Sequence, residues 1–274
     1  MKRKILKYSI YTIIIIAIII IAFSEKQFKE KYNSRDFSEI KESGIIKAVT
    51  EYNAVSFYVD IDTIRGFDYE LLNAFAEAKG LKAVITPEMS FEKRLEEVSS
   101  GKYDIMATGT ATVTELKDSL LFTVPINIGK QVLIQRKDTT DGYYIKSQLD
   151  MADKTIYIIK DSPAVYRMHN MMHEIADTIY IKEVTEYGTE QLMAMVSGGD
   201  IDYAVCEENT AKMYMPNFEN LDISTKVSFN QFYSWGVNKK SPELLDSLNS
   251  WLIDYLKTKE YKALQKKYFN QKKQ

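Results

Sequence analysis

The chain has 274 residues, of which 45% are apolar, enough material for one large or two medium domains with hydrophobic cores. A formal net charge of -2 at pH 7 gives no sign of nucleic-acid binding. The single cysteine, Cys206, excludes an intrachain disulfide framework.

The amino terminus combines positive charge with a long apolar run. An uncharged, isoleucine-rich stretch over residues 8–24 follows the basic residues Lys2, Arg3, Lys4 and Lys7. As a helix this stretch would be roughly 25 Å long, slightly short of a hydrocarbon core. The basic residues should stay in the cytoplasm and send the rest of the chain outward. We expect either an uncleaved anchor, with the chain facing the periplasm or cell exterior, or a signal cleaved near Ser24 that releases the chain into the periplasm.

Residues 25–43 are polar and charged, and they predict a stalk or a short surface helix. From Gly44 onward, short β-branched runs alternate with helical periods. Residues 45–50 predict a strand, and apolar residues at helical spacing over 67–78 predict a helix that stops at Gly80. A strand at 81–86, a helix ending at Gly101 and an apolar strand at 105–107 follow. This alternation predicts an α/β fold with largely parallel strands.

A helix-to-strand connection occurs twice, 98 positions apart. The segment VSSGKYDI at 98–105 is echoed by VSGGDIDY at 196–203, with valine, serine, glycine and aspartate at matching positions. The alternative is a chance similarity of two common connections, and we favour two similar α/β lobes. Near the end of the chain, Ser241 and Pro242 begin a helix with a broad apolar stripe, which predicts core packing.

A series of short motifs runs through the chain from Gly44 to Phe269. They are GIIKAVT at 44–50, GFDYEL at 66–71, GKYD at 101–104, FTVPI at 122–126, QVLI at 131–134 and WGVNKK at 235–240. In this order and spacing they resemble the family 3 extracellular solute-binding proteins. Residues 191–269 are most similar to the non-catalytic module of membrane-bound lytic transglycosylase F. The resemblance implies an α/β, two-lobed periplasmic-binding-protein type II fold with two hinge crossings, in which lobe 1 covers 44–130 plus 235–270 and lobe 2 covers 131–234.

The resemblance also implies a ligand-binding cleft between the lobes. In the family, a threonine and an arginine after a glycine grip an α-carboxylate, and an acid in the second lobe holds the ammonium group. The glycine corresponds to Gly109, but the other two positions hold Ala111 and Leu116. Hydroxyls and one ammonium partly substitute here, from Thr110, Thr112, Thr114 and Lys117. A lysine lacks the planar, two-pronged grip of arginine, so we expect no free α-amino acid held in the usual way. A polar turn that has lost its ligand is the alternative.

Other candidate ligand contacts come from both lobes. The acid of the second lobe corresponds to Glu207, although a solvated loop carboxylate is an equal alternative. Ser162 begins a helix that would face the cleft, and Gln131 lies at the first crossing. Aromatic candidates for stacking on the ligand are Tyr52, Phe57, Tyr58, Phe67, Tyr233 and Trp235, with core or hinge packing as the alternative for each.

Three classes of function remain open. We favour a non-enzymatic, extracytoplasmic module that captures a small polar ligand, an amino-acid derivative or a cell-wall peptide, for transport or sensing. The second class is a regulatory or scaffolding module of the cell envelope that has lost its ligand. The third is a lytic transglycosylase, the least favoured because no segment resembling its catalytic domain is found before Gln274.

No cofactor and no metal are expected. His169 and His173, with Glu174 beside them, suit an ordinary helix surface better than a metal site. The expected partners are a small-molecule ligand, the membrane through the N-terminal segment, and an ABC transporter permease or the cell-wall machinery.

Overall fold

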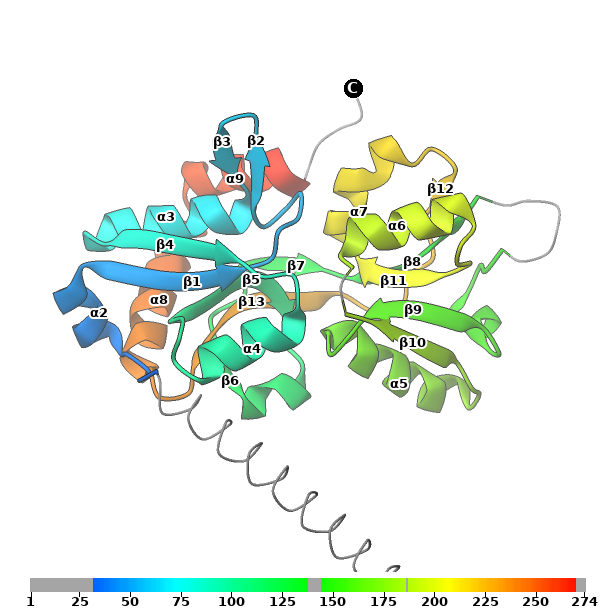
Figure 1. The fold of residues 1–274 in the computed structure, drawn as a ribbon, viewed down its shortest axis with the longest axis horizontal. Coiled ribbons are helices and arrows are strands. Elements are labelled where there is room, and N and C mark those ends of the chain that lie inside the picture. Colours follow the sequence, from blue (N-terminus) through cyan, green and yellow to red (C-terminus); the bar gives the residue numbers. More distant parts are fainter. Residues whose placement is uncertain (1–31, 138–143, 186, 270–274) are drawn as a thin grey trace, which may run out of the picture.

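The computed structural model describes residues 32–137, 144–185 and 187–269, which form two lobes, each built on its own sheet (Figure 1). The predicted membrane segment over 1–24 and the first part of the predicted stalk lie outside these residues. Within the described ranges, no helix combines the length and the apolar character needed to span a bilayer.

The sheet of lobe 1 has the strand order β4-β1-β5-β13-β6, and β7 also pairs with β13. Its strands are β1 (Ile45–Thr50), β4 (Lys82–Pro87), β5 (Ile105–Ala111), β6 (Leu120–Phe122), β7 (Asn127–Gly129) and β13 (Gln231–Asn238). Both β4 and β5 run parallel to β1, whereas β13 is antiparallel to β5, β6 and β7. A separate hairpin consists of β2 (Tyr58–Asp60) and β3 (Thr63–Arg65).

The sheet of lobe 2 has the order β10-β9-β11-β8-β12. Its strands are β8 (Gln131–Arg136), β9 (Thr155–Ile159), β10 (Tyr180–Val184), β11 (Ala204–Glu207) and β12 (Leu221–Asp222). Both β10 and β11 run parallel to β9, and β8 is antiparallel to β11 and β12. The largely parallel arrangement expected from the sequence therefore holds only for three strands of each sheet, because each sheet also contains an antiparallel strand, β13 or β8.

The two lobes share one topology. In lobe 1, β1 lies between β4 and β5, and the antiparallel strand β13 borders β5. In lobe 2, β9 likewise lies between β10 and β11, and the antiparallel strand β8 borders β11. The repeated connection leads into β5 in lobe 1 and into β11 in lobe 2. Gly101 follows helix α4 (Phe91–Ser99) and Gly199 follows helix α6 (Thr189–Gly198), both with a φ of 84°, which glycine adopts without steric cost. Asp104 and Asp202, three residues further on, each accept hydrogen bonds from an arginine. This agrees with two similar lobes predicted from the repeat.

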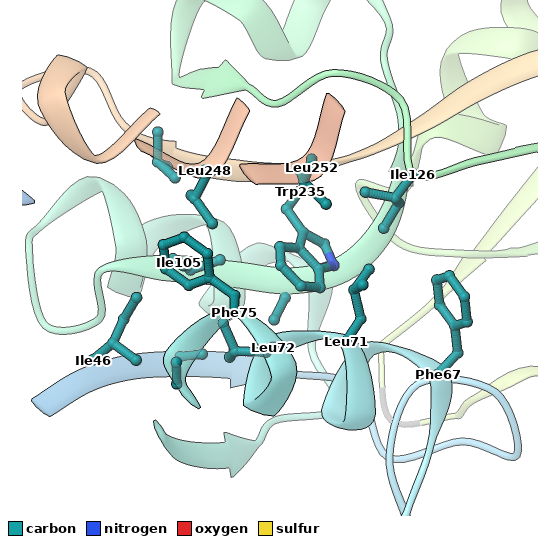
Figure 2. Close-up of a cluster of buried hydrophobic side chains, with 14 of the residues drawn as sticks. Ile46, Phe67, Leu71, Leu72, Phe75, Ile105, Ile126, Trp235, Leu248 and Leu252 are labelled. Atoms are coloured by element: carbon teal, nitrogen blue, oxygen red, sulfur yellow. The ribbon is translucent and has the colours of Figure 1, made fainter. Parts of the chain in front are cut away.

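Helices cover the sheet of lobe 1 and complete its core. They are α2 (Phe37–Ser43), α3 (Phe67–Lys79), α4 (Phe91–Ser99), α8 (Pro242–Tyr255) and α9 (Lys259–Phe269), with the 3₁₀ helix η1 (Thr114–Asp118). Figure 2 shows Trp235 of β13 between Leu71 of α3 and Leu252 of α8. The apolar stripe predicted after Pro242 packs in this core, because Leu244, Leu248 and Leu252 are fully buried.

Lobe 2 buries a cluster on each face of its sheet. Its helices are α5 (Pro163–Ile175), α6 (Thr189–Gly198) and α7 (Glu208–Tyr214), with the 3₁₀ helices η2 (Gln148–Met151) and η3 (Met215–Asn217). Met168 and Met171 of α5 pack in one cluster, and Leu192 and Val196 of α6 pack in the other.

The described end of the predicted stalk packs on lobe 1. Ile40 of α2 is fully buried, and Asp36 accepts hydrogen bonds from the backbone N-H groups of Glu243 and Leu244 at the start of α8. The return from lobe 2 also lies earlier than the boundary expected at residue 235, because β13 already pairs with β7 from Gln231.

Candidate functional site

A cavity of about 130 Å³ lies between the two lobes. Its lining comes from the carboxyl ends of β1, β5 and β11, the start of β8, and the first turns of α3 and α5. Strand ends and helix N-termini of α/β lobes offer backbone groups to a ligand at such a position. The contacts that join the lobes include an ion pair, in which Lys160 lies 3.1 Å from Glu92, and a hydrogen bond of 2.9 Å that the Ala54 N-H donates to the hydroxyl of Tyr214.

The wall on the lobe 1 side contains a buried ion pair. Glu51 follows β1 and Arg94 lies on α4, and an Nη2 to Oε2 distance of 2.9 Å joins their side chains, which are 12% and 2% exposed. Nη1 of Arg94 also donates to the carbonyls of Glu88 and Met89, at 2.6 and 2.9 Å. Burial lowers the pKa of Arg94, and the nearby carboxylates of Glu51 and Glu88 oppose that shift.

Asp68, in the first turn of α3, is the second acid of this wall. Its carboxylate accepts a hydrogen bond of 2.6 Å from the indole N-H of Trp235. Burial raises the pKa of Asp68 to about 7, although hydrogen bonds from Trp235, Ser56 and Gly109 act in the opposite direction. Gly66, at φ 142°, lets the start of α3 approach this closely, since a Cβ there would lie 2.2 Å from the carbonyl oxygen of Ser56. We call Glu51, Asp68 and Arg94 the lobe 1 wall.

Glu207 ends β11 and faces the cavity from lobe 2. Its carboxylate caps α7 by accepting from the Thr210 N-H at 2.7 Å, and it also accepts from the Asn209 amide at 2.8 Å. Burial raises the pKa of Glu207 to about 6, and hydrogen bonds from Asn209 and Thr210 oppose that rise. Gly129 leaves room for this carboxylate, because a Cβ there would lie 2.6 Å from Oε1 of Glu207.

Several lining residues carry buried polar atoms that have no hydrogen-bond partner among the described residues. In the cavity they are Arg94 Nε, Gln131 Oε1, Ser162 Oγ and Tyr233 OH. Gln131 and Glu207 are register partners on β8 and β11, so their side chains share one face of the sheet. We call Gln131, Ser162 and Glu207 the lobe 2 wall, and Tyr233 on β13 adjoins it. Such unpaired groups are costly to bury unless a ligand or water completes their hydrogen bonds.

The candidate residues taken from the sequence divide into two sets. Those that line the cavity are Phe67, Gly109, Thr110, Gln131, Ser162, Glu207 and Tyr233. Those that do not line it are Tyr52, Phe57, Tyr58, Thr112, Lys117 and Trp235. Trp235 is fully buried in the core of lobe 1, and Phe57 packs edge-on against Tyr69 with ring centroids 5.7 Å apart. Lys117 is exposed on η1.

The two positions that would complete the family's carboxylate clamp hold apolar side chains, and Ala111 lines the cavity. Ala111 and Leu116 are 1% and 2% exposed, and Leu116 packs with Val98 and Met106. These residues therefore contribute no polar group to the cavity.

Sequence reasoning identified Tyr233 among the aromatic candidates, but it missed Glu51, Asp68 and Arg94 as lining residues. The position of Glu51 directly after a predicted strand was an available signal, since strand ends meet at the ligand edge of such sheets. Arg94 offered none, because it follows Glu92 and Lys93 on a helix whose charged face is typical of solvent exposure.

The metal alternative finds no support in the described ranges, where no three histidine, cysteine or acidic side chains are grouped to hold an ion. Glu174, the residue beside His173, instead pairs with Arg167 over 2.6 Å.

Comparison with known sequences places the chain among solute-binding proteins. The family model of bacterial extracellular solute-binding proteins, family 3, matches residues 45–271. The chain is 26% identical over 242 residues to the membrane-bound lytic murein transglycosylase F of Alteromonas mediterranea. The aligned region covers 85% of this chain and 51% of that relative. It is 27% identical to the enzyme of the same name from Aeromonas salmonicida, over 81% of this chain and 43% of the relative. The chain thus spans about half the length of these curated relatives.

Solved structures share the fold. An amino acid ABC transporter substrate-binding protein, AbpA from Streptococcus pneumoniae, bound to L-arginine, superposes with a TM-score of 0.73 at 23% identity, covering 85% of this chain and 98% of that one. An ancestral arginine-binding protein bound to arginine gives 0.72 at 22% identity, with coverage of 82% and 98%. An ancestral amino acid-binding protein, AncCDT-1, described as a precursor of cyclohexadienyl dehydratase, also gives 0.72 at 22%, with coverage of 85% and 98%.

Proposed function

Because the chain belongs to family 3 of the bacterial extracellular solute-binding proteins, we propose that it captures a small polar solute in the cavity between its lobes, for transport or sensing outside the cytoplasm. The protein acts by binding, and no chemical step on the solute is part of the proposal. Two proteins of the same fold whose structures were solved with bound arginine support the binding of a small polar solute.

The observation that carries the proposal is the set of unpaired polar atoms in the cavity. Gln131, Ser162 and Tyr233 each place a buried oxygen there that has no partner among the described residues. A buried polar group without a hydrogen bond costs about 1–3 kcal/mol. A solute that donates to or accepts from these atoms removes that cost. The same hydrogen bonds orient the solute, which an apolar surface would not do.

The contacts between the lobes are suited to enclosing a solute. Both the Lys160 to Glu92 ion pair and the Ala54 to Tyr214 hydrogen bond connect one lobe to the other. Two crossings join the lobes, near residue 130 and before residue 231, so rotation about them opens the cavity to solvent. Closure then buries the solute from water.

A thermal-shift screen with amino acids, amines, sugars and short peptides tests the proposal. A solute that binds only the folded state stabilises it, so the melting temperature rises as the solute concentration is increased. The variant Tyr233→Phe should reduce that rise, whereas Tyr180→Phe, at an exposed position outside the cavity, should leave it unchanged. Unchanged melting curves across the whole panel would contradict solute binding.

A second candidate is a regulatory or scaffolding module of the cell envelope that binds no solute. The apolar residues Ala111 and Leu116, which stand where the family has a carboxylate clamp, favour it. The same screen separates the two candidates, because a ligand-free module shows no stabilisation by any solute. Release of soluble fragments from peptidoglycan by the purified protein would overturn both and favour a lytic enzyme.

The proposed location and partners follow from the same binding role. The basic and isoleucine-rich start of the chain would direct the lobes outward, toward a transporter permease or the cell-wall machinery. Protease accessibility of the lobes in intact spheroplasts tests this orientation. Protection equal to that of a cytoplasmic marker would contradict it.

A further inference from the structure

We propose that the solute is a positively charged organic amine without a carboxylate group. This inference rests on the proposed function and specifies the class of its ligand. The charged residues of the two walls, their pairing and the hydrogen-bond acceptors around Glu207 carry it.

The cavity is lined by more acidic than basic side chains. Among the described lining residues, the acids are Glu51, Asp68 and Glu207, and the only cation is Arg94. Arg94 and Glu51 are paired at 2.9 Å and largely buried, so together they are neutral toward a ligand. Glu207 remains without a cation of its own, and so does Asp68 in its ionised form. Negative charge in a buried site attracts a cation and raises the cost of admitting an anion.

A carboxylate would find no suitable place at Arg94. Three hydrogen bonds already hold its guanidinium, to the Glu51 carboxylate and to the carbonyls of Glu88 and Met89. An anion at the remaining N-H groups would lie beside Glu51, and like charges at that distance repel strongly in a buried site. Lys117 does not compensate, because it is exposed outside the cavity.

The lobe 2 wall, in contrast, offers acceptors to an ammonium group. Glu207 contributes its carboxylate, and its register partner Gln131 contributes an unpaired Oε1. The hydroxyl of Tyr233 is also unpaired. The Tyr233 ring and Oε1 of Glu207 both lie beside Gly129, because a Cβ added there would be 3.1 Å from the ring and 2.6 Å from Oε1. An ammonium carries three donors and no acceptor, and it also binds aromatic faces. These groups therefore match an amine better than a carboxylate or a neutral amide.

Calorimetry on the full chain in detergent, with matched pairs of compounds, tests the inference. The pairs are lysine with cadaverine and arginine with agmatine, which differ in the carboxylate, and glutarate serves as an anion without an amine. We expect at least one amine to bind at least tenfold more tightly than its amino acid, and glutarate not to bind. An amino acid that binds as tightly as its amine, or glutarate binding, overturns the inference and leaves solute binding intact.

Failure of the proposed function gives a different result. If sugars, peptides or neutral solutes bind while the amines do not, the inference is overturned and solute binding is retained. If no compound in any class binds, both are overturned.

Isosteric variants locate the amine. Glu207→Gln should weaken binding of the amine by at least 30-fold, because it removes the charge that faces the ammonium. Glu208→Gln is the matched control, since Glu208 pairs with Lys212 and does not line the cavity. Gln131→Met removes an acceptor without touching the cap of α7, and it should weaken binding about tenfold even if Glu207→Gln proves unstable. Unchanged affinity in both Glu207→Gln and Gln131→Met overturns the inference.

Discussion

The two walls of the cavity differ in how many of their side-chain oxygens have hydrogen-bond partners within the protein. On the lobe 1 wall, Glu51 pairs with Arg94 and Asp68 accepts from Trp235, so the charged groups are engaged within the protein. On the lobe 2 wall and the adjoining Tyr233, buried oxygens of Gln131, Ser162 and Tyr233 have no partner in the described part of the chain. We therefore expect the lobe 1 wall to stabilise the fold and, under the proposed function, the lobe 2 wall to contribute most of the ligand contacts.

The largest expected effect is at the ion pair of the lobe 1 wall. Arg94→Met leaves the Glu51 carboxylate buried without its cation, so we expect a loss of about 3 kcal/mol in the free energy of unfolding. Urea unfolding at pH 7 measures it. Lys93→Met is the matched control, because Lys93 is 64% exposed, and it should change stability by about 0.5 kcal/mol or less. The double variant Glu51→Met/Arg94→Met should recover part of the loss. A loss below about 1 kcal/mol for Arg94→Met would show that the pair is not structural.

The second prediction concerns Asp68 and the pH dependence of the free energy of unfolding. Its pKa in the folded protein, about 7, lies above the ordinary value of 3.8, so the folded state binds the proton more tightly than the unfolded state. This stabilisation is complete below pH 3.8 and is lost as the pH rises through about 7. In Asp68→Asn the amide does not titrate. The wild-type stability relative to Asp68→Asn should therefore fall by about 2 kcal/mol between pH 5 and 8. A constant difference across this range, from chemical unfolding at each pH, would contradict the assignment.

Gly129 tests whether the lobe 2 wall has spare room. Gly129→Ala places a methyl group 2.6 Å from Glu207 Oε1 and 3.1 Å from the Tyr233 ring, so one of them must shift. We expect a loss of about 1.5 kcal/mol in unfolding free energy. Gly198→Ala is the control, since its added Cβ would have only one neighbour, at 3.7 Å, and alanine favours helix. Equal stability of the two variants would mean that Glu207 has room to move.

The smallest expected effect is at Tyr233. Burial raises the pKa of its phenol, and the hydroxyl has no partner in the described residues. Tyr233→Phe should therefore leave the unfolding free energy unchanged or raise it by up to about 1 kcal/mol. Tyr214→Phe is the comparison variant, because it removes the hydrogen bond from the Ala54 N-H and should lower the free energy of unfolding by about 1 kcal/mol. A large loss for Tyr233→Phe would indicate a structural role like that of the lobe 1 wall.

Part of the candidate site could be predicted from the sequence. Gly109, Thr110 and Glu207 lie near the carboxyl ends of strands, and Ser162 precedes a helix, so local periodicity and the family motifs were sufficient to bring them to the cavity. The aromatic candidates were harder to predict. Trp235 and Phe57 are apolar enough for the core or for the cavity, and only the packing around them separates these alternatives.

The sequence alone therefore determined the α/β alternation, the repeated lobe topology and the membership of the family, because strand periodicity, helix caps and turn glycines act over a few residues. Tertiary structure alone decided which buried polar side chains pair with one another. Glu51 and Arg94 are 43 positions apart, and Asp68 and Trp235 are 167 apart. No local pattern encodes such pairs, since they form only when two strands and two helices pack around one cavity. That packing turned a helix arginine with no sequence signal into part of the lobe 1 wall.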